Sequence, residues 1–310
     1  MRFAATALVA ATLLTLAPPA IAQRNAGASP SPFVTAEMRA ANEARPVAAL
    51  TGQTKLATSI ELGRVLGPAG GNGGVLGVLI ILAMDRTTER LTAAANARAD
   101  GQIAPLRAAL SGFDANALAL EATRTGFAGQ PWFNAGPAEL RVSDPQAEDA
   151  PPPQRLFALD HPQASQLGLV SWRYQMSPDF SQVQVIASVE IVDGARQTPR
   201  YRQQLISIVK LDRPSFVPEE NVARWSANGG APARRALEMA FARASQTIPR
   251  ILELDQASYR HATDRRRTDR VIAVGYHGPV LFQDAAGPVF WARDGDQGLA
   301  AFVAVQTVAE

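Results

Sequence analysis

Two stretches of alternating apolar and polar side chains, GLVSWRYQM at residues 168–176 and SQVQVIASVEIV at residues 181–192, decide the fold. In the second stretch, for example, Val185 lies on an apolar face and Gln184 on a polar one. This period of two is typical of strands with one buried face, and a slip of one residue would bury the polar side chains. The turn sequence between the two stretches predicts an antiparallel pair.

The following residues extend the sheet and add a helix. Residues 201–211 predict a third strand, and their apolar side chains on both faces indicate a more buried position. Pro232 suits the first turn of a helix, which we expect Pro249 to kink or end. An apolar stripe on this helix would cover the sheet: Leu237, Phe241, Ala244 and Ile248. Short apolar runs at residues 271–305 predict hairpins. The sequence therefore predicts an α+β fold in which a helix covers an antiparallel sheet.

The first 22 residues have the pattern of a signal peptide for export. Arg2 gives a positive start, residues 3–17 form a short apolar core, and Ala20 and Ala22 frame a cleavage site before Gln23. The apolar core is too short to favour a retained membrane anchor. We therefore expect the mature chain to work in the periplasm, with membrane association as an alternative.

Composition divides the rest of the chain. Residues 23–50 are rich in Ala, Asn, Pro and Ser and predict a flexible leader. Residues 51–140 predict a mostly helical region, and residues 141–154 have the proline content of a linker. Residues 155–310 would then form the sheet domain with its C-terminal hairpins.

A glycine-rich run leads into the apolar segment VLGVLIILAM at residues 75–84. Gly70 and Gly74, and also Gly73 and Gly77, are four residues apart, a spacing that permits close approach of helices. Three interpretations stay open. The segment is a buried helix entered through a flexible turn, a membrane-inserted or self-associating element, or a phosphate-binding loop. The last is the weakest, because no Gly-Lys-Ser/Thr follows.

A second segment concentrates positive charge at residues 260–270. Its five arginines are Arg260, Arg265, Arg266, Arg267 and Arg270. One interpretation is a solvated connection that two aspartates partly neutralise. The other is a binding surface for anionic lipid headgroups, lipopolysaccharide phosphates or an acidic partner protein. Export argues against nucleic acid as the partner.

The composition excludes several kinds of chemistry. The chain has no cysteine, so disulfides, thiolate catalysis and cysteine-based metal sites are impossible. Removal of Arg2 with the signal peptide leaves 29 of the 30 basic side chains against 28 acidic ones, a balance that indicates no particular partner. No catalytic motif is present, and His161, His261 and His277 lie far apart in the sequence. We expect no cofactor and no metal.

The order of several motifs resembles a group of exported proteobacterial envelope proteins, several of them lipoproteins, whose function is unassigned. These motifs are the glycine run into the apolar helix (residues 73–84), IAPLRAAL (103–110), MSPDF (176–180), YRQQL (201–205) and WSANG (225–229). The resemblance implies residence in the envelope and supplies no catalytic residues. This chain departs from the lipoprotein members because it has no cysteine to carry a lipid.

Two functions are consistent with these features. The first is a non-enzymatic envelope protein that acts by contact with another protein or the membrane, with the glycine-rich helix as a route to a homo-oligomer. The alternative is a periplasmic ligand-binding or hydrolytic protein, whose site is assembled from residues distant in the sequence.

The signal-peptide pattern makes a direct prediction. The mature protein should begin at Gln23, because Ala20 and Ala22 are the small pair correctly placed after the apolar core. N-terminal sequencing of the protein from the periplasmic fraction tests this, and exported material that still begins at Met1 would contradict it.

Overall fold

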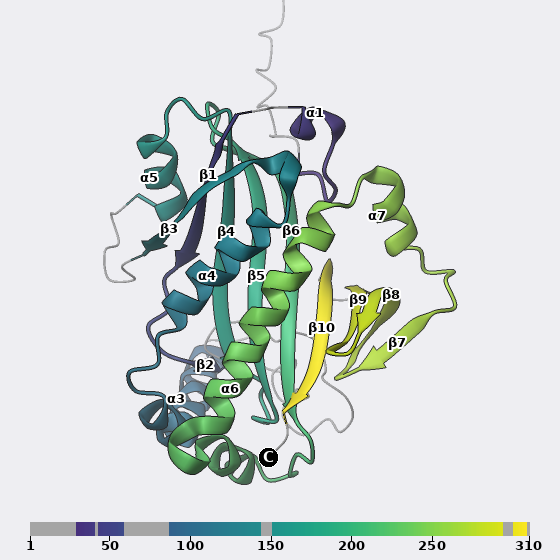
Figure 1. The fold of residues 1–310 in the computed structure, drawn as a ribbon. Coiled ribbons are helices and arrows are strands. Elements are labelled where there is room, and N and C mark those ends of the chain that lie inside the picture. The colour runs from purple at the N-terminus through teal and green to yellow at the C-terminus, as the bar shows by residue number, and fades with distance from the viewer. Residues whose placement is uncertain (1–28, 41–42, 59–86, 144–150, 294–299, 309–310) are drawn as a thin grey trace, which may run out of the picture.

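The computed structural model describes residues 29–40, 43–58, 87–143, 151–293 and 300–308, and these form a large mixed sheet with helices packed on it (Figure 1). The order of the paired strands is β3-β1-β4-β5-β6-β10-β9-β8-β7, and β2 pairs with β4. The strands are β1 (Arg45–Thr51), β2 (Ala57–Thr58), β3 (Ala135–Val142), β4 (Gln166–Met176), β5 (Gln182–Asp193), β6 (Thr198–Leu211), β7 (Arg270–Ala273), β8 (Tyr276–Asp284), β9 (Gly287–Arg293) and β10 (Ala300–Val308). The helices are α1 (Ala36–Arg39), α3 (Thr87–Ala109), α4 (Ala115–Ala128), the 3-10 helix η1 (Pro131–Phe133), α5 (Pro153–Asp160), α6 (Pro218–Leu252) and α7 (Gln256–Ala262).

The α+β class predicted from the sequence is confirmed, and so is the antiparallel order of β4, β5 and β6. Their apolar face packs beneath α4 and α6. Trp172 is buried there, with its ring centroid 5.2 Å from that of Phe241 on α6, and its indole N–H donates to Thr123 Oγ1 on α4 at 2.8 Å. The alternation of these strands therefore decides which face carries the main core.

The long helix α6 contains a break that its sequence explains. Residues 227–230 leave the helical conformation, and Asn228, Gly229 and Gly230 have positive φ angles. Pro232 lies in the first turn after the break, where its missing N–H costs nothing. Of the two outcomes expected at Pro249, a kink or an end of the helix, the end is wrong, because the helix continues to Leu252. A proline so near the C-terminal end interrupts only the last turn, and burial of the apolar residues after it offsets that loss.

The N-terminal half corrects the predicted organisation most strongly. The leader expected at residues 23–50 includes β1, a buried strand between β3 and β4. Strand β3 falls in the region expected to be mostly helical, so one sheet includes strands from both sides of the expected linker at 141–154. The sheet is also not purely antiparallel, because β1 runs parallel to β3 and β4, and β10 runs parallel to β6. Strand β1 is alanine-rich and buried on both faces, so it has no alternation to reveal it.

Three glutamines on the other face of the sheet were expected to face solvent and are buried instead. Gln175, Gln182 and Gln184 are each less than a tenth exposed. The Gln175 side-chain amide donates to Gln184 Oε1 at 3.0 Å, which provides part of the hydrogen bonding that burial requires. The glycines Gly70, Gly73, Gly74 and Gly77 lie outside the described residues. Within those residues, no helix is long and apolar enough to cross a membrane.

Neighbouring residues on β4 give a matched test of the facing. Val170 is completely buried in the main core, whereas Ser171 is exposed on the other face. We expect Val170→Asp to lower the free energy of unfolding by several kcal/mol, because it buries an unpaired charge. Ser171→Asp should change it by about 0.5 kcal/mol or less. Urea denaturation measures both, and equal losses would contradict the assigned facing.

Candidate contact surface

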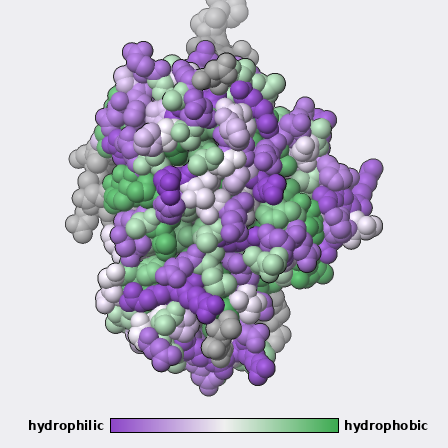
Figure 2. Space-filling view, viewed as in Figure 1, coloured by the Kyte–Doolittle hydropathy of each residue, from purple (hydrophilic) through white to green (hydrophobic). Residues whose placement is uncertain are grey.

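The arginine-rich segment forms a projecting arm, which we define as residues 260–272. It runs from the last turn of α7 through a connection into β7, the strand at one end of the sheet (Figure 1). Figure 2 shows hydrophilic residues gathered on this projection, next to a more hydrophobic area. Asp255 caps the start of α7 by accepting a hydrogen bond from the Ser258 amide at 2.8 Å. The arm therefore leaves the body from a defined helix.

Most of the positive charge of the arm faces solvent. Arg260, Arg265, Arg266 and Arg270 are exposed, while Arg267 is largely covered and forms an ion pair with Asp269. The hydrogen bond from Arg267 lowers the pKa of the Asp269 carboxyl, so this aspartate stays charged. Five arginines against two aspartates leave residues 260–270 with a net charge of +3. The aspartates thus neutralise the arm in part, and the exposed arginines remain.

Hydrogen bonds to the main chain hold the arm together. Arg270 Nη1 donates to the Arg265 carbonyl at 3.0 Å, and the Arg266 amide donates to Asp264 Oδ1 at 2.9 Å. Arg267 Nη1 reaches back to the His261 carbonyl on α7. These contacts fix the backbone of the connection. The arm therefore loses less conformational freedom on binding a partner than a flexible chain would.

Strand β7 adds an apolar side chain that the sequence analysis missed. Ile272 is 86 % exposed, and His277, its partner on β8, is exposed too. Val271 and Ala273 point the other way and pack against the core beneath β9 and β10. An isoleucine in a hairpin is normally expected in the core. Ile272 is exposed because it lies on the strand at the end of the sheet. The sequence did hold a signal: Ile272 is two residues from Arg270, so on a strand it shares the face of a charged side chain.

A hollow of about 640 Å³ lies between the end of α6, the end of α4 and the β8–β9 turn. Its lining comprises Gly129, Gln246, Pro249, Arg250, Glu253, Phe282, Gln283 and Asp284. Positive and negative side chains are mixed here, and the two guanidiniums of Arg243 and Arg250 stack on Phe282 at 5.2 and 5.9 Å. The ionised carboxylate of Asp284 in this lining has a structural explanation.

That explanation is the buried Arg243. Its side chain is completely buried, and it donates to Asp284 Oδ2 and to the Gly287 carbonyl, both at 2.6 Å. The bond from Arg243 lowers the pKa of the Asp284 carboxyl, with help from the Ala286 amide. These contacts fasten the β8–β9 turn to α6. The lowered pKa of Asp284 therefore follows from a structural contact and does not indicate catalysis.

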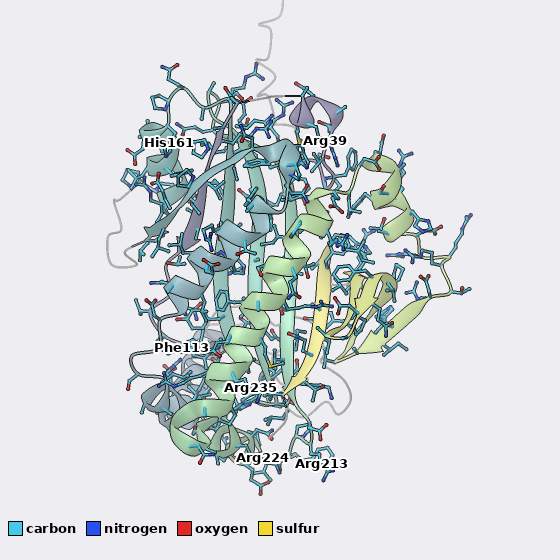
Figure 3. The ribbon with its side chains drawn as sticks, viewed as in Figure 1. Arg39, Phe113, His161, Arg213, Arg224 and Arg235 are labelled. Atoms are coloured by element: carbon cyan, nitrogen blue, oxygen red, sulfur yellow. The ribbon has the colours of Figure 1, made fainter. Side chains whose placement is uncertain are left out.

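A second exposed apolar side chain lies at the start of α6. Phe216 is fully exposed on a loop that Asn221 fixes by accepting from the Ser215 amide at 2.7 Å. Figure 3 shows Arg213, Arg224 and Arg235 at this end of the molecule. Asp212, Glu219 and Glu220 lie on the same loop and helix turn, so the charges here balance. This end lacks the charge excess of the arm.

The histidines do not form a site. His161 Nε2 lies 3.1 Å from Glu139 Oε1 near α5, while His261 is on α7 and His277 on β8. Trp225, the first residue of the WSANG motif, is buried and donates to the Phe180 carbonyl at 2.7 Å, so it is a core residue. Across the described ranges, no three metal-ligating side chains come together.

The chain matches no family model, no curated protein and no solved structure with which it was compared. A function for this chain must therefore be inferred from its own residues.

The Arg243–Asp284 pair gives a prediction about pH. Because the folded-state pKa of Asp284 is below its ordinary value of 3.8, the pair stabilises the fold above that pH, and this stabilisation is lost as the pH falls through the lower folded-state pKa. We expect Asp284→Asn to cost at most about 1 kcal/mol at neutral pH, since the carboxylate is 45 % exposed and solvent screens the pair. The cost should shrink below pH 3.8.

Urea denaturation at several pH values measures this difference. Glu238→Gln serves as the control, because it removes an exposed carboxylate from α6, the helix that carries Arg243. A loss in Asp284→Asn that stays constant down to the lowest pH would contradict the role of the ion pair.

Proposed function

We propose that the protein is exported and acts in the cell envelope without catalysing a reaction, by contact with a negatively charged partner through the arm. One observation carries this proposal. The arm has a net charge of +3, and its exposed arginines lie on a backbone that its own hydrogen bonds constrain. The signal-peptide pattern and the resemblance to exported envelope proteins support the location.

The charge of the arm favours association more than stability. Exposed like charges repel one another, so four exposed arginines on one projection bring the fold no evident benefit. A partner of opposite charge would relieve that repulsion and would be steered toward the arm. The contact should therefore weaken as salt screens it.

The glycine-rich segment enters the proposal as a second contact. Gly70, Gly73, Gly74 and Gly77 have the spacing for close helix approach, which would suit a homo-oligomer or a membrane-associated state. The proposed function requires no cofactor and no nucleic acid. The hollow near Arg250 gives the ligand-binding alternative a place, and saturable binding of a small molecule there would favour that alternative.

Charge reversal tests the proposed function. We expect Arg265→Glu combined with Arg266→Glu to reduce the share of the protein that sediments with the envelope after gentle lysis by about half or more, because the net charge of the arm changes from +3 to −1. Washing the wild type in about 1 M salt, where the Debye length is about 3 Å, should have a similar effect.

The matched control is Arg196→Glu combined with Arg235→Glu, which makes the same change in charge at exposed positions outside the arm. Immunoblotting of the fractions measures the result. Equal sedimentation of the two double variants would contradict a contact through the arm, and wild-type protein found only in the cytoplasm would contradict export.

A further inference from the structure

We propose that β7 is a docking strand, and that the partner of the arm adds an extended acidic segment of polypeptide to its free edge. This inference rests on the proposed function, because it names the chemistry of the partner that the arm contacts. In the described part of the chain, β7 is the last strand in the order and pairs with β8 alone. A strand in that position offers backbone hydrogen-bonding groups to another chain.

The register of the hairpin shows which groups are on offer. The Val280 amide donates to the Asp269 carbonyl at 3.0 Å, and Arg270 lies opposite Pro279. Hydrogen-bonded and non-hydrogen-bonded pairs alternate along an antiparallel ladder. Val271 and Ala273 therefore direct their N–H and C=O groups toward β8, whereas Arg270 and Ile272 direct theirs away from it. The proline fits this pattern, because it faces a position that needs no N–H.

Three backbone groups of β7 thus point away from β8, toward its free edge: the N–H and C=O of Ile272 and the C=O of Arg270. The remaining group, the Arg270 amide, donates to the Thr268 carbonyl at 2.9 Å. The hairpin turn fixes this register, since Val274 and Gly275 have φ angles of 48° and 84°, as a tight two-residue turn requires. The other side of β7 packs on the core through Val271 and Ala273. The edge is therefore held in place before any partner arrives.

The side chains on the exposed face define what would bind. Arg270 and Ile272 project from the same face of β7, with the exposed Arg265 and Arg266 close in sequence to its start. An incoming strand places its own alternate side chains beside them. An acidic side chain would pair with Arg270, and an aliphatic one two residues away would cover Ile272. The partner segment is thus extended, with an acidic and an aliphatic side chain two residues apart on the same face.

The edge of β7 is only partly protected against pairing. Short length and charged side chains are common ways to keep a terminal strand from pairing, and β7 has both. Ile272 contradicts that purpose, because an aliphatic side chain that is 86 % exposed makes the edge more adhesive. A lipid surface could bind the arginines but could not satisfy the Ile272 N–H and C=O in a ladder. A polypeptide segment satisfies both requirements.

The test uses two labelled peptides and the full mature protein. The first probe is Thr-Glu-Thr-Val-Thr-Glu-Thr with capped ends, in which a glutamate lies two residues from the valine on either side and shares its face. The second is Thr-Glu-Thr-Pro-Thr-Glu-Thr, which has the same charge but lacks the N–H opposite Ile272. We expect fluorescence anisotropy to show at least about tenfold tighter binding of the valine peptide, because it adds an unbroken backbone ladder and the contact with Ile272. Hydrogen exchange of the Ile272 amide should slow when that peptide is present and should not change with the proline peptide.

Two variants separate this inference from the proposed function. Ile272→Pro removes the edge N–H without removing a bond to β8, so it should reduce binding of the valine peptide to the level of the proline peptide. Arg265→Glu with Arg266→Glu should weaken both peptides. Strand addition is overturned if both peptides bind equally and the exchange of the Ile272 amide does not slow. If charge reversal then abolishes this binding, the charged contact of the proposed function still holds.

The remaining outcomes are also decisive. If charge reversal does not weaken peptide binding, the proposed function is overturned, and with it the inference that rests on it. Absence of binding at about 1 mM of either peptide overturns the docking strand, because such a surface should reach at least that affinity. If Ile272→Pro fails to fold, the exchange of the Ile272 amide in the wild type decides alone. Binding of the wild type to vesicles with about one-third anionic phospholipid, but to neither peptide, assigns the arm to lipid headgroups.

Discussion

The rest of the structure depends on the packing of the second part of α6 across the middle strands, where Phe241 meets Trp172. This contact fixes the face of β4, β5 and β6 that is buried. The break at residues 227–230 lets the helix serve two surfaces. Its first part holds the β4–β5 turn, because Asn221 donates to the Asp179 carbonyl and Trp225 to the Phe180 carbonyl. Its second part then covers the sheet, and the break allows this part to run in a different direction from the first.

Two buried arginines attach the margins of the sheet to this centre. Arg45, at the start of β1, donates to the carbonyls of Trp132 and Phe133, and so holds the N-terminal strand to η1. Burial lowers the pKa of the Arg45 guanidinium, whose charge is stabilised by these carbonyls and by the face of the Phe133 ring at 4.9 Å. Arg243 does the same for the β8–β9 turn through Asp284 and Gly287. A buried guanidinium needs its hydrogen-bond acceptors, so the contacts of these two residues limit how far the margins can move.

The arm follows from this arrangement. Strand β7 packs through Val271 and Ala273 on a core that includes β9 and β10, and Arg243 joins the β8–β9 turn to α6. The same rigid support leaves Arg270 and Ile272 facing outward at the end of the sheet. A contact surface on so short a strand depends on that support, because a two-stranded ribbon alone is only marginally stable in water.

The sequence by itself determined the features that depend on near neighbours. The period of two gave the central strands and their main-core face, and Pro232 gave the restart of α6. The arginines of the arm were also visible, because charge density is local. Tertiary structure decided the rest. Strand β1 has no alternation, since both its faces are buried, and it enters the sheet only because β3 and β4 lie on either side of it. Gln184 is buried and Ile272 exposed for the same reason: the sequence gives the two faces of a strand, but what covers each face comes from segments far along the chain.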